Sequence, residues 1–126
     1  MPRARYNKYR AVKTPYGGHV YASGIEAARA QELDLLITMG AVRYWLRQVT
    51  FRLGEDGESL RVDYVVWWAS GIVIAEDVKG RETRDFIRKK KLWAKYAPCP
   101  LHILKRRGNG WTTTVVDVRP YPEVTQ

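Results

Sequence analysis

Residues 42–79 limit the possible folds of this chain more than any other segment does. They hold three stretches rich in β-branched and aromatic residues, VRYWLRQVTFRL, LRVDYVVWW and IVIAEDVK, separated by the turns GEDGES and ASG. Such stretches are typical of strands. The two later stretches are apolar on both faces, so the sequence predicts a three-stranded meander in a sheet that is covered on both sides.

Helix signals lie on both sides of this meander. SGIE at residues 23–26 is a capping box that predicts a helix start at Ser23, and Gly40 is the predicted stop. The expected packing face of this first helix comprises Ile25, Ala28, Leu33, Leu36, Ile37 and Met39. A second helix is predicted over residues 83–96 and ends before Pro98, and its expected packing residues are Phe86, Trp93 and Tyr96.

The last part of the chain predicts a pair of strands. LHILK and WTTTVVDV flank the turn-rich segment RRGNG. The resulting order of helix, three strands, helix and two strands is that of an α/β fold. A length of 126 residues, 45% of them apolar, fits one domain, which we divide into a basic arm (1–15), a core (16–118) and a tail (119–126).

The charge distribution indicates the kind of partner. The net charge is +9; residues 1–25 carry five cations and no acid, and residues 79–107 carry eleven cations and two acids. Such a surface attracts polyanions, of which DNA is the usual one, although a basic surface can also serve solubility alone. The apolar run 62–74 is too short for a membrane helix and no secretory signal is visible, so we expect a cytoplasmic protein without a membrane partner.

Several kinds of site are excluded by the residues available. GEDGES lacks the lysine of a phosphate-binding loop. One cysteine, Cys99, and two histidines, His19 and His102, are too few for a zinc site, and Cys99 is expected to be a structural thiol. Any metal ion would therefore be held by oxygen atoms.

Two carboxylates and a lysine are expected to converge on the sheet. If the second and third strands close through a loop of residues 69–71, Asp63 faces Asp77 across the ladder. Because side chains alternate along a strand, Lys79 shares the face of Asp77, whereas Glu76 points to the other face. Facing like charges destabilise a sheet, and a shared Mg²⁺ or Mn²⁺ would remove that conflict. The alternative is an ordinary salt bridge between Asp77 and Lys79.

Three motifs add a resemblance to a known group of enzymes. SGIE, VDYVV (62–66) and IAEDVKG (74–80), in this order of elements, resemble motifs of the PD-(D/E)XK nuclease superfamily. The likeness covers residues 8–105 and is greatest to small phage-encoded, archaeal-type Holliday junction resolvases and to the endonuclease I of T-odd phages. It implies a restriction-endonuclease-like core with the last strand pair in a mixed central sheet. Val62 stands in place of the family's proline, and Asp77 where the resolvases more often have glutamate.

The resemblance also implies the site residues. Glu26 matches the helix acid, Asp63 the first strand acid, and Asp77 and Lys79 the D/E-X-K pair. Mg²⁺, with Mn²⁺ as a substitute, would be held by Asp63, Asp77 and the main-chain carbonyl of Val78, with Glu26 as a ligand directly or through water. Lys79 could act as a base or as an electrostatic stabiliser.

Two other acids compete for these roles. Glu32 is the alternative helix acid; if it is buried, we expect it to pair with Arg29 or Arg61. Glu76 could be mistaken for the motif acid, but its position in the strand directs it to the wrong face.

The expected DNA contacts are basic residues of the arm and of the second helix: Arg3, Arg5, Lys8, Arg10, Lys13, Arg84, Arg88, Lys89, Lys90 and Lys91. No base-reading motif is visible, so recognition would depend on backbone contacts and DNA shape. Symmetric cuts about a branch favour a homodimer, and five tryptophans in a small domain are compatible with an interface.

The activity that these features favour is metal-dependent hydrolysis of phosphodiesters near four-way DNA branches, as in a phage Holliday junction resolvase. One alternative is a nuclease of flaps, nicks or plain duplex DNA. The other is a non-catalytic basic DNA-binding module whose carboxylates serve folding only.

Overall fold

The computed structural model describes residues 11–119 and confirms the α/β class. Its elements are, in chain order, β1 (Thr14–Tyr16), β2 (His19–Tyr21), α1 (Gly24–Thr38), β3 (Val42–Arg52), β4 (Ser59–Trp68), β5 (Val73–Val78), α2 (Arg84–Tyr96), β6 (Leu101–Arg107) and β7 (Gly110–Val116). The predicted order of helix, meander, helix and strand pair is confirmed. The short β1–β2 hairpin is an addition, since the sequence predicted only its turn.

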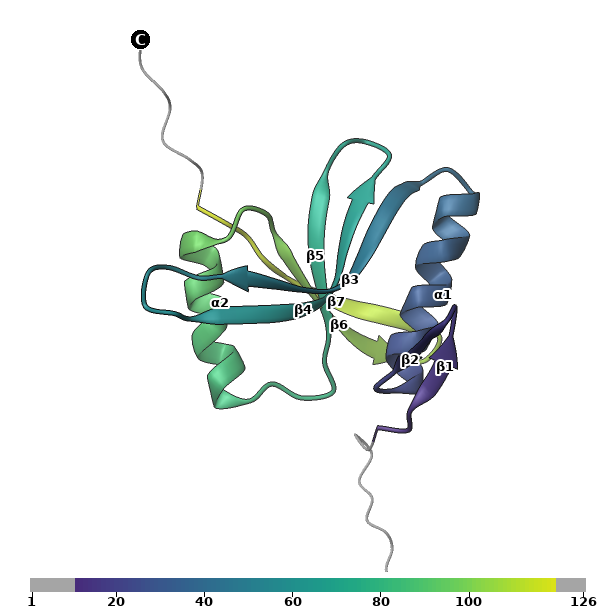
Figure 1. The fold of residues 1–126 in the computed structure, drawn as a ribbon, viewed down its shortest axis with the longest axis horizontal. Coiled ribbons are helices and arrows are strands. Elements are labelled where there is room, and N and C mark those ends of the chain that lie inside the picture. The colour runs from purple at the N-terminus through teal and green to yellow at the C-terminus, as the bar shows by residue number, and fades with distance from the viewer. Residues whose placement is uncertain (1–10, 120–126) are drawn as a thin grey trace, which may run out of the picture.

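The five long strands form one mixed sheet between the two helices (Figure 1). The strand order is β3-β4-β5-β6-β7, and neighbours are antiparallel except for β5 and β6, which are parallel. A parallel pair needs a crossover connection, and α2 provides it. The inner strands β4 and β5 are buried on both faces, as their apolar composition predicted.

Each face of the sheet has its own hydrophobic core. The α1-side core comprises Tyr21, Ala27, Ala30, Leu33, Val42, Tyr64 and Val66. The α2-side core comprises Leu53, Leu60, Val62, Val65, Ala75, Phe86, Trp93, Ala97, Cys99, Leu101 and Ile103. Cys99 is therefore buried, as expected of a structural thiol, and burial raises the pKa of that thiol.

Strand β4 changes face at Asp63. Residues two apart on a regular strand share a face, yet Val62 belongs to the α2-side core and Tyr64 to the α1-side core. The pairing of β3 with β4 also omits Gln48, which has a positive φ of 52°. The irregularity lies beside Asp63, between the two cores.

The predicted ends of α1 are confirmed. The Ser23 hydroxyl accepts a hydrogen bond from the Glu26 backbone N–H (3.2 Å). At the other end Gly40 has a φ of 84° and its N–H donates to Ile37 O, while the Ala41 N–H donates to Leu36 O. These two bonds form a Schellman motif, which explains why glycine stops the helix here.

The predicted packing face of α1 is confirmed for Leu33 and Leu36 and wrong for its other large residues. The helix buries Ala27, Ala30 and Leu33, whereas Ile25, Ile37 and Met39 are exposed. Apolar residues occur all around this helix, so the wheel could not select one face, and the helix lies against the sheet with its small side chains. In α2, Phe86 and Trp93 are buried as predicted, but Tyr96 is 46% exposed and lies across Gly54.

The boundaries of the core differ slightly from those predicted. Thr14 and Pro15 belong to β1 rather than to an arm. The backbone N–H of Arg119, the first residue of the predicted tail, donates to Ala94 O on α2 (2.8 Å). In the part of the chain that the structure describes, neither helix has the length and apolar character needed to cross a membrane.

Candidate functional site

Asp63 and Asp77 meet where β4 and β5 run side by side. The register pairs Tyr64 with Glu76 and Trp67 with Val73, and the next pair in this register is Asp63 with Asp77. The Trp68 N–H donates to Ile72 O (2.9 Å), which closes the short loop on which the predicted register depended. The expected juxtaposition of the two carboxylates is therefore present.

Each of the two carboxylates is bonded to the backbone of the opposite strand. The Asp63 N–H donates to Asp77 Oδ1 (3.2 Å), and the Val78 N–H donates to Asp63 Oδ2 (2.8 Å). These bonds replace ladder bonds at the point where the β4–β5 pairing ends. They hold the side chains in one arrangement, as a preorganised site requires.

The environment of this pair disfavours two negative charges. Asp77 is only 2% exposed. Burial, followed by the charge of Asp77, raises the pKa of Asp63 to about 9. Asp77 Oδ2 is buried and receives no hydrogen bond within the described residues, although Lys79 Nζ forms an ion pair with it at 3.0 Å. The pair thus needs a proton or another cation.

Lys79 is fixed between Asp77 and an aromatic ring of α2. Its ammonium lies 4.3 Å from the centre of the Phe86 ring, in a cation–π contact, and its side chain is 27% exposed. The lysine therefore presents its charge at the carboxylate pair while part of it remains open to a substrate. Asp63, Asp77 and Lys79 converge as the sequence predicted.

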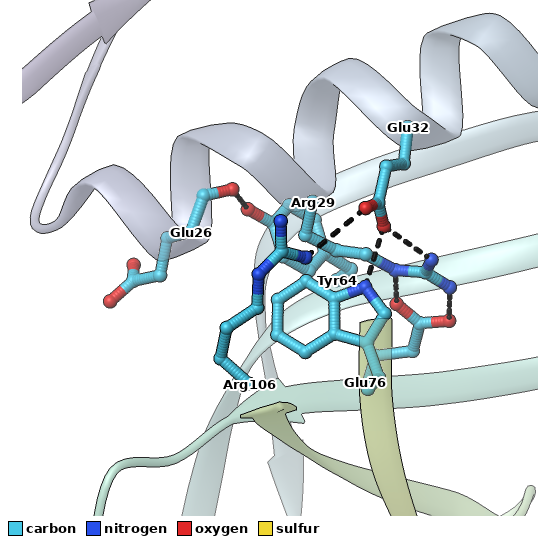
Figure 2. A network of polar contacts seen from close by, with 7 residues as sticks. Glu26, Arg29, Glu32, Tyr64, Glu76 and Arg106 are labelled. Carbon is cyan, nitrogen blue, oxygen red and sulfur yellow. Dashed lines mark hydrogen bonds and ion pairs between the residues drawn. The ribbon is translucent and has the colours of Figure 1, made fainter. Parts of the chain in front are cut away.

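Glu26 lies near this group, on the first turn of α1. Its carboxylate accepts a hydrogen bond from the Ser23 hydroxyl (3.3 Å), so it does not reach back to the Ser23 N–H as in the full capping box. Burial raises the pKa of Glu26, and the charge of Asp77 adds to this effect. The hydrogen bond from Ser23 opposes it, but only in part. Figure 2 shows its carboxylate pointing away from the other polar groups of α1.

Those other groups form a separate ion-pair network between α1 and the sheet (Figure 2). Arg29 donates to both carboxylate oxygens of Glu76, with Nε–Oε1 at 2.8 Å and Nη2–Oε2 at 2.6 Å. Glu76 is 1% exposed and this bidentate pair accounts for its burial. The prediction that Glu76 points away from Asp77's face is confirmed.

Glu32 belongs to the same network, and its carboxylate accepts hydrogen bonds from three side chains. It accepts from Arg29 (3.1 Å), Arg106 (3.3 Å) and the Trp111 indole (2.7 Å). Burial alone would raise the pKa of Glu32, but these hydrogen bonds outweigh it and hold the pKa below its usual value. Its expected pairing with Arg29 is confirmed and that with Arg61 is not found. These partners give Glu32 a structural role.

The carboxylate pair has the donors that a hard divalent cation prefers. Each carboxylate oxygen has two lone pairs, so the backbone bonds leave acceptor capacity, and within the described residues Asp77 Oδ2 has only the ion pair with Lys79. One or two carboxylates with waters and phosphate oxygens is a usual set for Mg²⁺. Among residues 11–119 no three acidic, histidine or cysteine side chains are grouped closely enough to hold an ion.

The predicted DNA-binding cations differ in their surroundings. Arg3, Arg5, Lys8 and Arg10 lie outside the described residues, and Lys13 is exposed. On α2, Arg88 pairs with Glu58 and Asp85, Lys89 with Asp85, and Lys90 with Glu82 (2.5 Å). Lys89 and Lys90 are half-buried and paired, so less of their charge is available to DNA than the sequence predicted. Arg84 and Lys91 are exposed without a described acidic partner.

Sequence reasoning missed three residues close to the candidate site: Phe86 as a support for Lys79, Arg29 as the partner of Glu76, and Arg47, whose charge acts on Glu26. Arg29 was predicted only as a partner of Glu32, which lies three residues away on the same helix, and helix spacing gives no signal for Glu76, which is 47 residues away. Phe86 and Arg47 had no local signal, since both approach the site from other elements.

A comparison with protein families gives one match. The model of a family described as a protein of unknown function (DUF1064) matches residues 6–108. No curated protein and no solved structure matches the chain.

Proposed function

We propose that this chain, which belongs to the DUF1064 family, is a metal-dependent, structure-selective endodeoxyribonuclease of the Holliday junction resolvase type. The observation that carries the proposal is the meeting of Asp63, Asp77 and Lys79 at the end of the β4–β5 pairing. A raised pKa for one of two buried carboxyls, beside a lysine, is typical of a functional site.

The arrangement of the fold supports the same proposal. A helix, an antiparallel meander, a second helix and a strand beside the third strand of the meander follow one another in the order expected of a PD-(D/E)XK core. The acids and the lysine occupy the elements on which that core would carry them. Glu76 and Glu32 are engaged in the ion-pair network. The acids that remain as candidates for catalysis are therefore Asp63, Asp77 and Glu26.

In this proposal Asp63, Asp77 and the Val78 carbonyl hold Mg²⁺, which Mn²⁺ can replace. A divalent ion there supplies Lewis-acid activation of the scissile phosphate and of the attacking water. Glu26 orients water at the edge of the site. The Lys79 ammonium, held by Asp77 and Phe86, orients the nucleophile and stabilises the negative charge that develops on the phosphate. The expected products carry 5′-phosphate and 3′-hydroxyl ends, as in the family that the motifs resemble.

The distribution of charge supports DNA as the substrate. Arg84 and Lys91 on α2 and Lys13 before β1 are exposed cations, and Phe86 brings the start of α2 next to Lys79. Cations on both sides of an acidic site allow a polyanion to approach it. Two such sites in a homodimer would cut the two strands of a junction symmetrically.

The direct test compares a labelled four-way junction with a linear duplex of the same arms, each in Mg²⁺ and in EDTA. We expect paired, metal-dependent cuts near the branch while the duplex is spared. Asp77→Asn should abolish cleavage and leave junction affinity unchanged or tighter, because it removes a negative charge beside the phosphate. Asp56→Asn, in the exposed β3–β4 turn, is the matched control and should cut normally.

Other outcomes assign other functions. Equal cutting of junction and duplex would indicate a nuclease of flaps, nicks or plain duplex. Tight binding with no cutting in Mg²⁺ or Mn²⁺ would indicate a DNA-binding module. If Asp77→Asn fails to fold, as judged by circular dichroism, the carboxylate pair is structural and the proposal is wrong.

A further inference from the structure

A pocket of about 350 Å³ lies beside the candidate site, between the β1–β2 hairpin, α1 and β3. We call it the hairpin pocket. Tyr16, Tyr21 and Trp45 give it aromatic walls, and His19, Asp34 and Arg47 give it polar groups. Its volume is in the range of sites that hold small ligands or single groups of larger ones.

Asp34 is held at one side of the hairpin pocket by two aromatic donors. The Tyr16 hydroxyl donates to its Oδ2 (2.6 Å), and the Trp45 indole N–H donates to its Oδ1 (2.9 Å). Each carboxylate oxygen can accept a second hydrogen bond. Asp34 is thus a fixed acceptor for N–H groups of a planar ligand that stacks on these rings.

Arg47 provides the opposite charge. Its guanidinium lies 4.6 Å from the centre of the Tyr21 ring and donates through Nη2 to Val20 O (3.0 Å), and its buried Nε has no described partner. A guanidinium has five N–H donors, so most of this capacity is unused within the described residues. A cation over the ring also disfavours a second cation, which argues against a methylated ammonium as the ligand.

The hairpin pocket is connected to one of the candidate catalytic acids, Glu26, through Arg47 and Tyr64. Arg47 pairs across the ladder with Tyr64, and the Tyr64 hydroxyl donates to the main-chain carbonyl of Glu26 (2.5 Å). The positive charge of Arg47 acts on the Glu26 carboxyl. A nucleotide in this pocket would therefore be linked to the candidate site through Glu26.

We propose that the hairpin pocket holds one unpaired base of a branched DNA, with its exocyclic amine donating to Asp34 and its phosphate contacting Arg47. The inference rests on DNA being the substrate. Aromatic faces stack any base, and a carboxylate accepts from the amine of cytosine, adenine or guanine, which thymine lacks. A base leaves its stack more easily at a branch or flap than within an intact duplex, so this pocket selects branched DNA, with a preference for bases that carry an amine.

The test measures binding in EDTA, so that it does not depend on cleavage. The probe is a four-way junction with a single unpaired 2-aminopurine at the branch, compared with a duplex in which the same base is paired. We expect wild-type protein to quench the fluorescence of the unpaired base by stacking. Arg47→Gln should weaken junction binding about tenfold and leave duplex binding unchanged.

Three further proteins sharpen the result. Asp34→Asn should abolish the preference for an amine-bearing base over thymine at the branch, and His19→Ala, at an exposed residue, tests the pocket without a risk to folding. Arg43→Gln is the matched control, since Arg43 lies on the same strand and donates to Ala69 O. If Arg47→Gln and Arg43→Gln weaken junction and duplex binding alike, or if no quenching occurs on binding, the pocket does not hold a base.

The two proposals fail in different ways. If the wild-type protein cuts junctions, and the Arg47→Gln and Asp34→Asn variants bind and cut as the wild type does, the proposal for the pocket is wrong and the proposal of a nuclease stands. A protein that quenches 2-aminopurine in EDTA but never cuts refutes the nuclease and supports the pocket.

Discussion

The replacement Asp63→Asn should make the metal-free protein more stable. Asparagine has the shape of a protonated aspartic acid, so it can still accept from the Val78 N–H and can donate to Asp77. Asparagine cannot ionise, so no second negative charge can develop beside Asp77 as pH rises. Stabilisation by loss of an acid is expected where a protein keeps a carboxylate for function rather than for folding.

The magnitude follows from the raised pKa. In the unfolded chain Asp63 ionises near its ordinary value of 3.8, whereas in the folded chain it keeps its proton up to a pKa of about 9. Between these two pKa values, each rise of one pH unit lowers the free energy of unfolding by about 1.4 kcal/mol. The wild-type protein therefore loses about 4 kcal/mol of stability between pH 4 and pH 7, and relaxation of the site reduces this to about 2–4 kcal/mol. The variant avoids that loss.

Urea unfolding in EDTA at several pH values between 4 and 8 measures this difference. We expect the two proteins to be equally stable near pH 4 and the variant to be more stable by about 2–4 kcal/mol at pH 7. Glu76→Gln is the control, because Glu76 is a buried carboxylate of the neighbouring strand that is paired with Arg29. It should lose about 3 kcal/mol at pH 7, as expected when a buried ion pair is broken.

The reasoning would be refuted if Asp63→Asn destabilised the protein at pH 7, or if its effect did not change with pH. Either result would mean that Asp63 is ionised and stabilising in the metal-free fold. The carboxylate pair would then stabilise the fold, as Glu76 does, and would not require a metal ion.

Three more predictions concern metal, acid and DNA. Millimolar Mg²⁺ should raise the Tm of the wild-type protein by several degrees and that of Asp77→Asn by none, as measured by scanning fluorimetry; an equal rise in both would place the ion elsewhere. Glu32→Gln should make stability less sensitive to acid, because the folded protein holds the pKa of Glu32 low. The contribution of the Glu32 carboxylate to stability is present above about pH 4.5 and is lost as pH falls through the folded-state pKa. Urea unfolding at pH 7 and pH 3 measures this difference. Replacing Arg84 and Lys91 with Gln should weaken junction binding and flatten its dependence on salt, whereas an unchanged slope would mean that α2 does not face DNA.

The meander and its register could be predicted because both depend on neighbouring residues. The pattern of β-branched residues predicted β3, β4 and β5, and the short loop before β5 determined which residues face each other. Asp63 and Asp77 were placed together by counting from that loop. The Ser23 cap and the Gly40 stop were also readable, since each is a local backbone requirement.

The packing of the helices could not be predicted in the same way. Residues Ile25 and Met39 of α1 are apolar but exposed, and Ala27 and Ala30 are buried because small side chains let the helix approach the sheet. On α2, Lys89 and Lys90 find acidic partners in their own helix or just before it, which reduces the free charge of that surface.

The amino-acid order was sufficient to specify the order of the helices and long strands, the β4–β5 register and the convergence of Asp63, Asp77 and Lys79, because turns, caps and strand alternation act over a few residues. It was not sufficient to identify most of the partners that the other acids find. Glu76 and Glu32 became structural only when Arg29, Arg106 and Trp111 reached them from distant positions in the chain. The hairpin pocket likewise exists only where β1, β2, α1 and β3 meet, since long-range contacts depend on how whole elements pack against one another.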